Sequence, residues 1–101
     1  MWTFVMFDLP VKTKDEKKAY CQFRKALIEL GFLKMQYSVY IRFAQSDEKA
    51  TALARRIREQ LPPGGEVRIL EVTGKQFENM LVFQGKKQRP PEEKPLQLTI
   101  F

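Results

Sequence analysis

The sequence predicts an α+β fold in which a single sheet carries both helices on one face. An apolar run rich in aromatic and β-branched residues lies at 2–9, and a strictly alternating segment lies at 33–43. Helical periodicity occupies the stretches 13–31 and 46–61. With a further strand at 66–72, the order becomes the β-α-β-β-α-β of a ferredoxin-like sheet.

The first strand and the first helix carry the clearest local signals. Residues 2–9 are apolar at nearly every position, which predicts a strand buried on both faces that ends before Pro10. Thr13 begins a T-K-D-E capping box with Glu16, and Gly31 stands where a C-cap glycine belongs. Basic residues occupy the arc opposite the apolar one and give the helix a cationic outer face: Lys14, Lys17, Lys18, Arg24 and Lys25.

The alternating segment 33–43 would span roughly 36 Å as one strand, so we expect a bend or two consecutive strands. No Gly, Pro or Asn within it marks the break. Its polar positions, among them Lys34 and Tyr40, suit an edge strand, a dimer seam or a surface that contacts nucleic acid. The second helix follows, capped by Ser46 or Asp47, with two arginines on its outer side: Arg55 and Arg58.

The C-terminal part divides into an extra strand, a linker and a tail. After a short turn capped by Thr73, residues 80–84 are predicted as an additional strand that ends at Gly85. We therefore expect a ferredoxin-like domain over 1–85, a Pro-rich extended linker over 86–95 and a strand-like tail over 96–101. The tail is expected to add to a sheet edge of a second subunit or of a partner; the alternative is a disordered end.

Composition narrows the function classes. Eighteen Lys and Arg against twelve Asp and Glu give a net charge of +6, which favours a polyanionic partner: nucleic acid first, an anionic membrane second. The alternative is a basic protein without such a partner. The absence of histidine excludes Ser-His-Asp and Cys-His catalysis, and a single cysteine excludes an internal disulfide. No apolar run is long enough to span a membrane, so we expect a cytoplasmic protein.

Strand 2–9 also predicts a homodimer. Both of its faces are apolar, yet the two helices of a ferredoxin-like fold cover one face of the sheet. In a chain of 101 residues, the expected cover for the other face is a second copy.

Asp8 is the candidate metal ligand, because a carboxylate at a strand end suits Mg²⁺. One carboxylate supplies too few ligands, but a two-fold dimer would bring two copies of Asp8 together, with water and phosphate oxygens completing the shell. The alternative is that Asp8 accepts a hydrogen bond from a local backbone N–H.

The cationic face of the first helix, together with Lys12 before it, is the candidate nucleic-acid-binding surface. Each cation on it can meet a phosphate and release a counterion. The alternative is a solvated helix face.

Four segments in register resemble one protein family. They are MFDLP at 6–10, AYCQFRKAL at 19–27, GFLKMQYSVY at 31–40 and TGKQFENM at 73–80. Together they resemble CRISPR-associated protein two, the small adaptation subunit of CRISPR antiviral defence, and in particular its type II members. The resemblance covers residues 2 to 85.

The resemblance implies a ferredoxin-like homodimer joined through its sheet faces. It implies that Asp8 and its symmetry mate hold Mg²⁺ for an endonuclease (an endoribonuclease or a DNase), and that Lys34 and Tyr40 contact substrate. It also implies a role in spacer acquisition, in which the dimer bridges integrase subunits and lies along the duplex prespacer DNA. Many members carry Tyr before the aspartate where this chain has Phe7, which removes a hydroxyl.

Two functions therefore stand side by side. One is a DNA-bridging subunit of the integration complex, and the other is a Mg²⁺-dependent phosphodiesterase acting on duplex DNA or single-stranded RNA. The residues show a cationic surface but no complete active site, which favours binding over catalysis; integration need not require cleavage. The remaining alternative is a basic nucleic-acid-binding or interaction module without catalytic activity.

Overall fold

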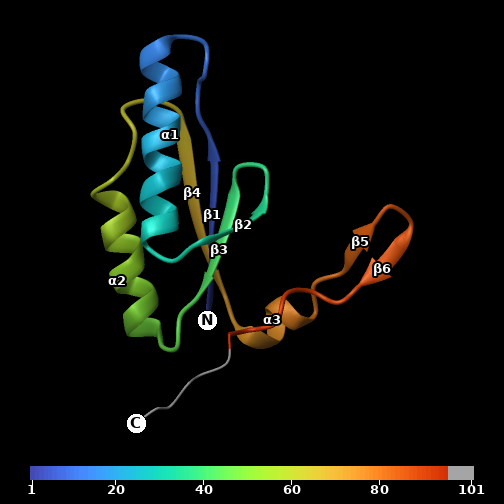
Figure 1. The fold of residues 1–101 in the computed structure, drawn as a ribbon. Coiled ribbons are helices and arrows are strands. Elements are labelled where there is room, and N and C mark those ends of the chain that lie inside the picture. Colours follow the sequence, from blue (N-terminus) through green and yellow to red (C-terminus); the bar gives the residue numbers. More distant parts are fainter. Residues whose placement is uncertain (96–101) are drawn as a thin grey trace.

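The computed structural model describes residues 1–95, which contain a four-stranded antiparallel sheet with two long helices on one face (Figure 1). The strand order β2-β3-β1-β4 is the ferredoxin-like order, so the predicted fold class is confirmed. The predicted tail lies outside the described residues. The elements are β1 (Trp2–Asp8), α1 (Lys14–Glu29), β2 (Leu33–Gln36), β3 (Val39–Phe43), α2 (Asp47–Arg58), β4 (Glu66–Val72), α3 (Gly74–Glu78), β5 (Val82–Gln84) and β6 (Lys87–Arg89).

Helix α1 begins with the predicted capping box. The Glu16 N–H donates to Thr13 Oγ1 (3.1 Å), and the Thr13 N–H donates to Glu16 Oε1 (2.9 Å). After the helix, Gly31 adopts a φ of +88°, a left-handed conformation that glycine takes without strain. Helix α1 therefore begins directly after Thr13 and ends shortly before Gly31, as predicted.

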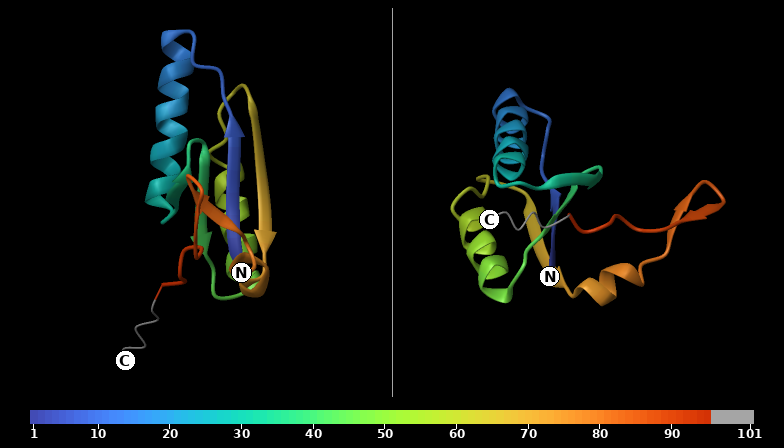
Figure 2. Two further views of the ribbon diagram at one scale, coloured as in Figure 1. Left: turned by 90° about the vertical axis from the view of Figure 1, so that its right-hand side faces the viewer. Right: turned by 60° about the horizontal axis from the view of Figure 1, so that its bottom comes forward.

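The helix side of the sheet holds the larger core. Val5 and Phe7 of β1 point to this side, where the Phe7 ring meets the Phe23 ring of α1 edge-on, with centroids 5.2 Å apart. Both helices lie on this side of the sheet (Figure 2). The buried residues of this core are Val5, Phe7, Leu9, Phe23, Leu27, Phe32, Tyr40, Ala44, Ala50, Leu53 and Ile57.

The opposite side of the sheet, here called the open face, is also apolar. Alternate residues of β1 point to it, and Trp2 stacks on Phe77 of α3 with ring centroids 4.1 Å apart. Helix α3 covers one end of this face. Elsewhere Leu70 of β4 stays 49% exposed and Leu33 of β2 stays 71% exposed. Strand β1 is thus apolar on both faces, as the sequence predicts, and the open face is only partly covered within one chain.

The segment 33–43 forms two strands joined by a tight turn at Tyr37 and Ser38. Ser38 adopts a φ of +60°, which is uncommon for a residue other than glycine, and its carbonyl oxygen accepts a hydrogen bond from the Phe7 N–H (3.0 Å). Neither Gly nor Pro stands at this turn, so local sequence did not reveal where the two strands separate.

The prediction of an extended linker over 86–95 is wrong for its first residues, where strand β6 forms. Gly85 adopts a φ of +64° and allows a two-residue hairpin loop, so that Gln84 pairs with Lys87 and β6 forms inside the expected linker. Figure 1 shows this hairpin of β5 and β6 projecting away from the four-stranded sheet. No helix within residues 1–95 has the length and apolar character needed to cross a bilayer.

Candidate nucleic-acid interface

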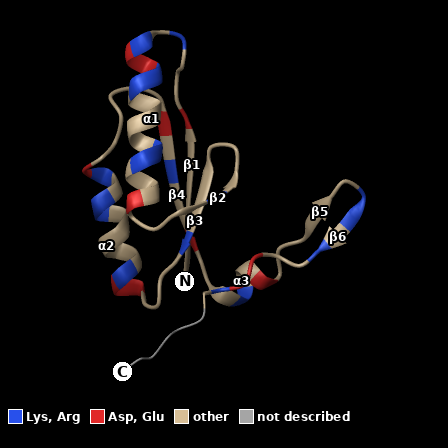
Figure 3. Ribbon diagram, in the orientation of Figure 1, with Lys and Arg blue, Asp and Glu red and all other residues tan. Residues whose placement is uncertain are grey.

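Lys and Arg recur along α1 (Figure 3), and their exposed side chains define what is here called the α1 cationic face. The acidic residues of this helix, Asp15, Glu16 and Glu29, lie in its first and last turns, and Glu16 is engaged in the capping box. The middle of the helix therefore presents positive charge without interruption by acids. The side chains of this face are all exposed: Lys14, Lys17, Lys18, Arg24 and Lys25, with Lys12 exposed just before the helix.

None of these cations is neutralised within the part of the chain that the structure describes. The ion pairs found there join Arg68 to Glu66 and Arg89 to Glu92, and neither pair involves a residue of α1. A solvated helix face and a phosphate-binding face look alike in this respect. What favours binding is the excess of positive charge in one stripe.

Helix α2 adds a second group of cations on the same side of the sheet. Arg55 and Arg58 are exposed in its last turn, where cations also interact favourably with the helix dipole. Arg56, which the sequence analysis did not single out, is exposed beside them. Because both helices pack on one face, their outer sides belong to one layer of the molecule (Figure 2).

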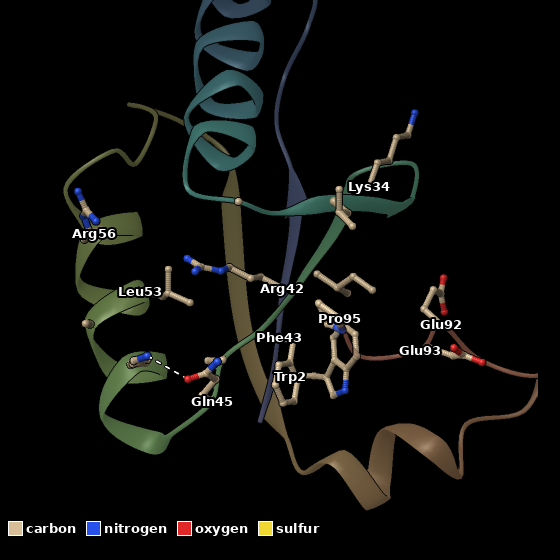
Figure 4. Close-up of a pocket in the computed structure, with 16 residues that line it drawn as sticks. Trp2, Lys34, Arg42, Phe43, Gln45, Leu53, Arg56, Glu92, Glu93 and Pro95 are labelled. Carbon is tan, nitrogen blue, oxygen red and sulfur yellow. Dashed lines mark hydrogen bonds between the residues drawn. The ribbon is translucent and has the colours of Figure 1, made fainter. Parts of the chain in front are cut away.

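Arg56 also lines a groove of about 890 Å³ beside β3 (Figure 4). Strand β2 pairs with β3 only as far as Ile41, so the next residue of β3, Arg42, lies beyond this pairing. Arg42 Nη1 donates to the Leu30 carbonyl oxygen (2.8 Å), which ties β3 to the end of α1. Sequence periodicity did not reveal this groove, because it depends on where β2 stops.

Asp8 ends β1 as an exposed carboxylate. Val5 and Phe7 point to the helix side, so strand alternation places Asp8 on the open face. Among residues 1–95 its carboxylate accepts no hydrogen bond, so the structure gives no support to a local capping role. Phe7 lies buried on the helix side, so the hydroxyl that Phe lacks would not lie on the same face as Asp8.

Glu66 and Arg68 accompany Asp8 and were missed by the sequence analysis. Glu66 of β4 stands directly opposite Asp8 in the strand register, and its Oε1 accepts from Arg68 Nε (2.8 Å). Like charges placed opposite each other repel, and the arginine offsets part of that repulsion. The signal that would have found this pair is the β1–β4 register, which requires the strand order.

The donor set around Asp8 fits Mg²⁺ only in a partial way. No group of three or more His, Cys, Asp or Glu residues gathers within residues 1–95. One chain supplies Asp8 with Glu66 opposite it. Mg²⁺ commonly takes one or two carboxylates plus substrate phosphate oxygens and waters, so these residues suit an ion completed by substrate, and they do not form an all-protein cage.

Gly65 fixes the backbone around Asp8. It has a φ of +83°, and a Cβ added there would lie 2.6 Å from the Asp8 carbonyl oxygen. We expect Gly65→Ala to lower the free energy of unfolding by about 2–4 kcal/mol, through left-handed strain and overlap. Denaturant unfolding measures this. Gly74→Ala is the control because nothing lies within 4 Å of its added Cβ. Equal stability of Gly65→Ala and the wild type would contradict this role.

Lys34 and Tyr40, the two substrate-contact positions implied by resemblance, lie in different surroundings. Lys34 is exposed on β2, with its Nζ 5.8 Å from the centroid of the Tyr37 ring. Tyr40 is 2% exposed and stacks on Phe7 in the core, because β3 lies between β2 and β1 and is not an edge strand. Burial raises the pKa of Tyr40, and the positive charge of Arg24 opposes this in part. The Tyr40 ring is therefore not part of the accessible cationic surface.

Comparison with known proteins gives consistent matches. Residues 1–80 match the family described as CRISPR associated protein Cas2. The chain is 45% identical over 101 residues to the CRISPR-associated endoribonuclease Cas2 of Paracidovorax avenae, covering 94% of that protein. It is 46% identical to the protein of the same name from Parvibaculum lavamentivorans, over 100% of both chains. It is 42% identical to that from Flavobacterium psychrophilum, over 100% of this chain and 88% of the relative.

Proposed function

Because this chain belongs to the CRISPR associated protein Cas2 family, we propose that it is the small subunit of a CRISPR adaptation complex. In this proposal it is a cytoplasmic homodimer that binds duplex prespacer DNA and bridges the integrase subunits during spacer acquisition. The single observation that carries the proposal is the α1 cationic face, an exposed stripe free of ion pairs within residues 1–95. Each of these exposed cations can meet a phosphate and release a counterion, which supports a DNA-binding role.

The open face supports the homodimer. Leu70 of β4 is exposed beside the half-buried Phe4 of β1, and Leu33 is exposed on β2, beyond the buried Ile41 of β3. Large apolar residues exposed on one sheet face favour a protein interface there. Covering it with the same face of a second copy would contribute several kcal/mol at about 25 cal/mol per Å².

The hairpin of β5 and β6 also supports the homodimer. Leu81 and Phe83 are exposed on it, and within residues 1–95 the two strands pair with each other alone. An isolated two-stranded hairpin is marginally stable in water. In a dimer, the hairpin could pair with β4 of the second copy, because β4 is an edge strand of the four-stranded sheet and offers unpaired backbone groups.

We expect the protein to be a dimer at micromolar concentration, with a mass of twice 11.9 kDa by light scattering. Leu70→Glu places a charge in the proposed interface and should yield monomers. The matched control is Ile28→Glu on α1, because Ile28 is 51% exposed against 49% for Leu70. A monomeric wild type, or a Leu70→Glu protein that stays dimeric, would contradict the interface.

A second candidate function is Mg²⁺-dependent phosphodiester hydrolysis; the relatives are named endoribonucleases. The observation that favours it here is the position of Asp8. This exposed carboxylate lies on the open face, so a two-fold dimer through that face places both copies of Asp8 at the interface.

Bound Mg²⁺ would supply Lewis-acid polarisation of a phosphate oxygen and activation of water. The part of this chain is to hold the ion with Asp8. Duplex DNA and single-stranded RNA are the two candidate substrates. Binding without cleavage is the alternative, and it leaves the bridging role unchanged.

A further inference from the structure

Tyr37 is the most exposed of the large apolar and aromatic residues in the described part of the chain. It is 72% exposed at the turn between β2 and β3, although tyrosine normally buries much of its ring. The next residue, Ser38, adopts a left-handed conformation, and its carbonyl oxygen accepts a hydrogen bond from the Phe7 N–H. The ring is thus presented to solvent by a turn that is anchored to the end of β1.

Neighbouring side chains hold the Tyr37 ring in place. The Tyr20 ring of α1 stacks beside it, with centroids 6.4 Å apart and an interplanar angle of 24°. Interaction with the neighbouring Tyr20 hydroxyl raises the pKa of Tyr37. Lys34 Nζ lies 5.8 Å from the Tyr37 centroid. An aromatic side chain held in this way loses little conformational entropy when a planar ligand stacks on it.

The Tyr37 ring adjoins the α1 cationic face. Tyr20 lies between Lys17 and Arg24 on the helix, three residues after one and four before the other, so the three side chains are surface neighbours. Lys34 brings a further cation from the strand side. An exposed aromatic ring bordered by cations is the arrangement with which proteins bind single-stranded nucleic acid, since bases stack while phosphates are neutralised.

We propose that Tyr37 is a stacking platform for an unpaired base of single-stranded nucleic acid, with Lys34, Lys17 and Arg24 meeting the adjoining phosphates. This inference rests on the proposed nucleic-acid-binding function and adds a base-contacting residue to it. Bases within a duplex are already stacked on one another, so the ring discriminates in favour of single strands or unpaired ends. Tyr37 lies on the helix side of the turn, against Tyr20, so stacking does not compete with dimerisation through the open face.

The test compares binding of a fluorescently labelled single-stranded oligonucleotide and a duplex of the same sequence. Tyr37→Ala should weaken single-strand binding by about 5-fold to 150-fold, the range for loss of one base–aromatic stack. Duplex binding should change less than about twofold. Tyr37→Phe keeps the ring and should bind like the wild type. Leu61→Ala is the control, because Leu61 is also a large exposed apolar residue, 47% exposed, and lies outside the Tyr37 stack.

A spectroscopic signature accompanies the affinities. A single 2-aminopurine in the oligonucleotide should lose fluorescence on binding the wild type and Tyr37→Phe, but not on binding Tyr37→Ala at saturating protein. Equal losses of single-strand and duplex affinity in Tyr37→Ala, or unchanged single-strand affinity, would overturn the inference. The proposed function fails separately: it is contradicted if reversal of Lys17 and Lys18 leaves duplex affinity intact, whatever Tyr37 does.

Discussion

Asp8→Ala should lower Mg²⁺-dependent cleavage of nucleic acid by more than about a hundredfold and leave spacer integration nearly unchanged. Loss of residues that merely support a metal ligand costs about 10–100-fold, so loss of a ligand itself should cost more. In the proposed bridging role, integration would depend on shape and charge, and Asp8 lies on the open face, away from the α1 cationic face. A nuclease assay with and without Mg²⁺, run beside an integration assay with the integrase partner, measures both effects.

Glu71→Ala is the control for this experiment, since Glu71 is an exposed carboxylate on β4 that pairs with Thr3, far along the strand from Asp8. It should leave both activities unchanged. Cleavage that persists in purified Asp8→Ala protein would show that the activity comes from another site, and cleavage absent from the wild type would favour the purely bridging role.

Reversing two charges on α1 should have the second large effect. Each phosphate contact contributes about 0.9 to the slope of log affinity against log salt, so Lys17→Glu with Lys18→Glu should reduce that slope by about 2. Between about 50 and 200 mM salt, the loss of duplex affinity should then shrink by about tenfold. Titrations of a labelled duplex at several salt concentrations measure the slope.

The control for the charge reversal is Lys75→Glu with Lys87→Glu. These lysines are exposed on α3 and β6, so the variant changes the net charge equally but leaves α1 intact. It should keep most of the wild-type slope. If the two double variants behave alike, the effect reflects total charge and the α1 cationic face has no special role.

Local signals in the sequence predicted the elements well where a residue has one dominant preference. The Thr13 capping box, the left-handed glycine Gly31 after α1 and the continuous apolar run of β1 each depend on a few adjacent residues, and each appears in the structure. The turn at Ser38 could not be predicted from adjacent residues, because its left-handed conformation is supported by a hydrogen bond from the N–H of Phe7, thirty-one positions earlier in the chain.

The candidate site shows the same division. Exposure of the α1 cations follows from helical periodicity, so the sequence was sufficient for them. The pairing of Asp8 with Glu66 and the burial of Tyr40 depend on strand order, which alternation within one segment does not reveal. Gly85 was interpreted as the end of a strand because the two-residue hairpin requires a partner strand in a segment that composition marked as a linker.

We infer that two copies of this chain act as one duplex-binding unit. This is tested by the mass of the complex with a short DNA duplex at low salt, measured by size-exclusion chromatography with light scattering. We expect the mass of one duplex plus twice the 11.9 kDa of a single chain. A complex with one chain per duplex, or free duplex eluting apart from the protein, would contradict it.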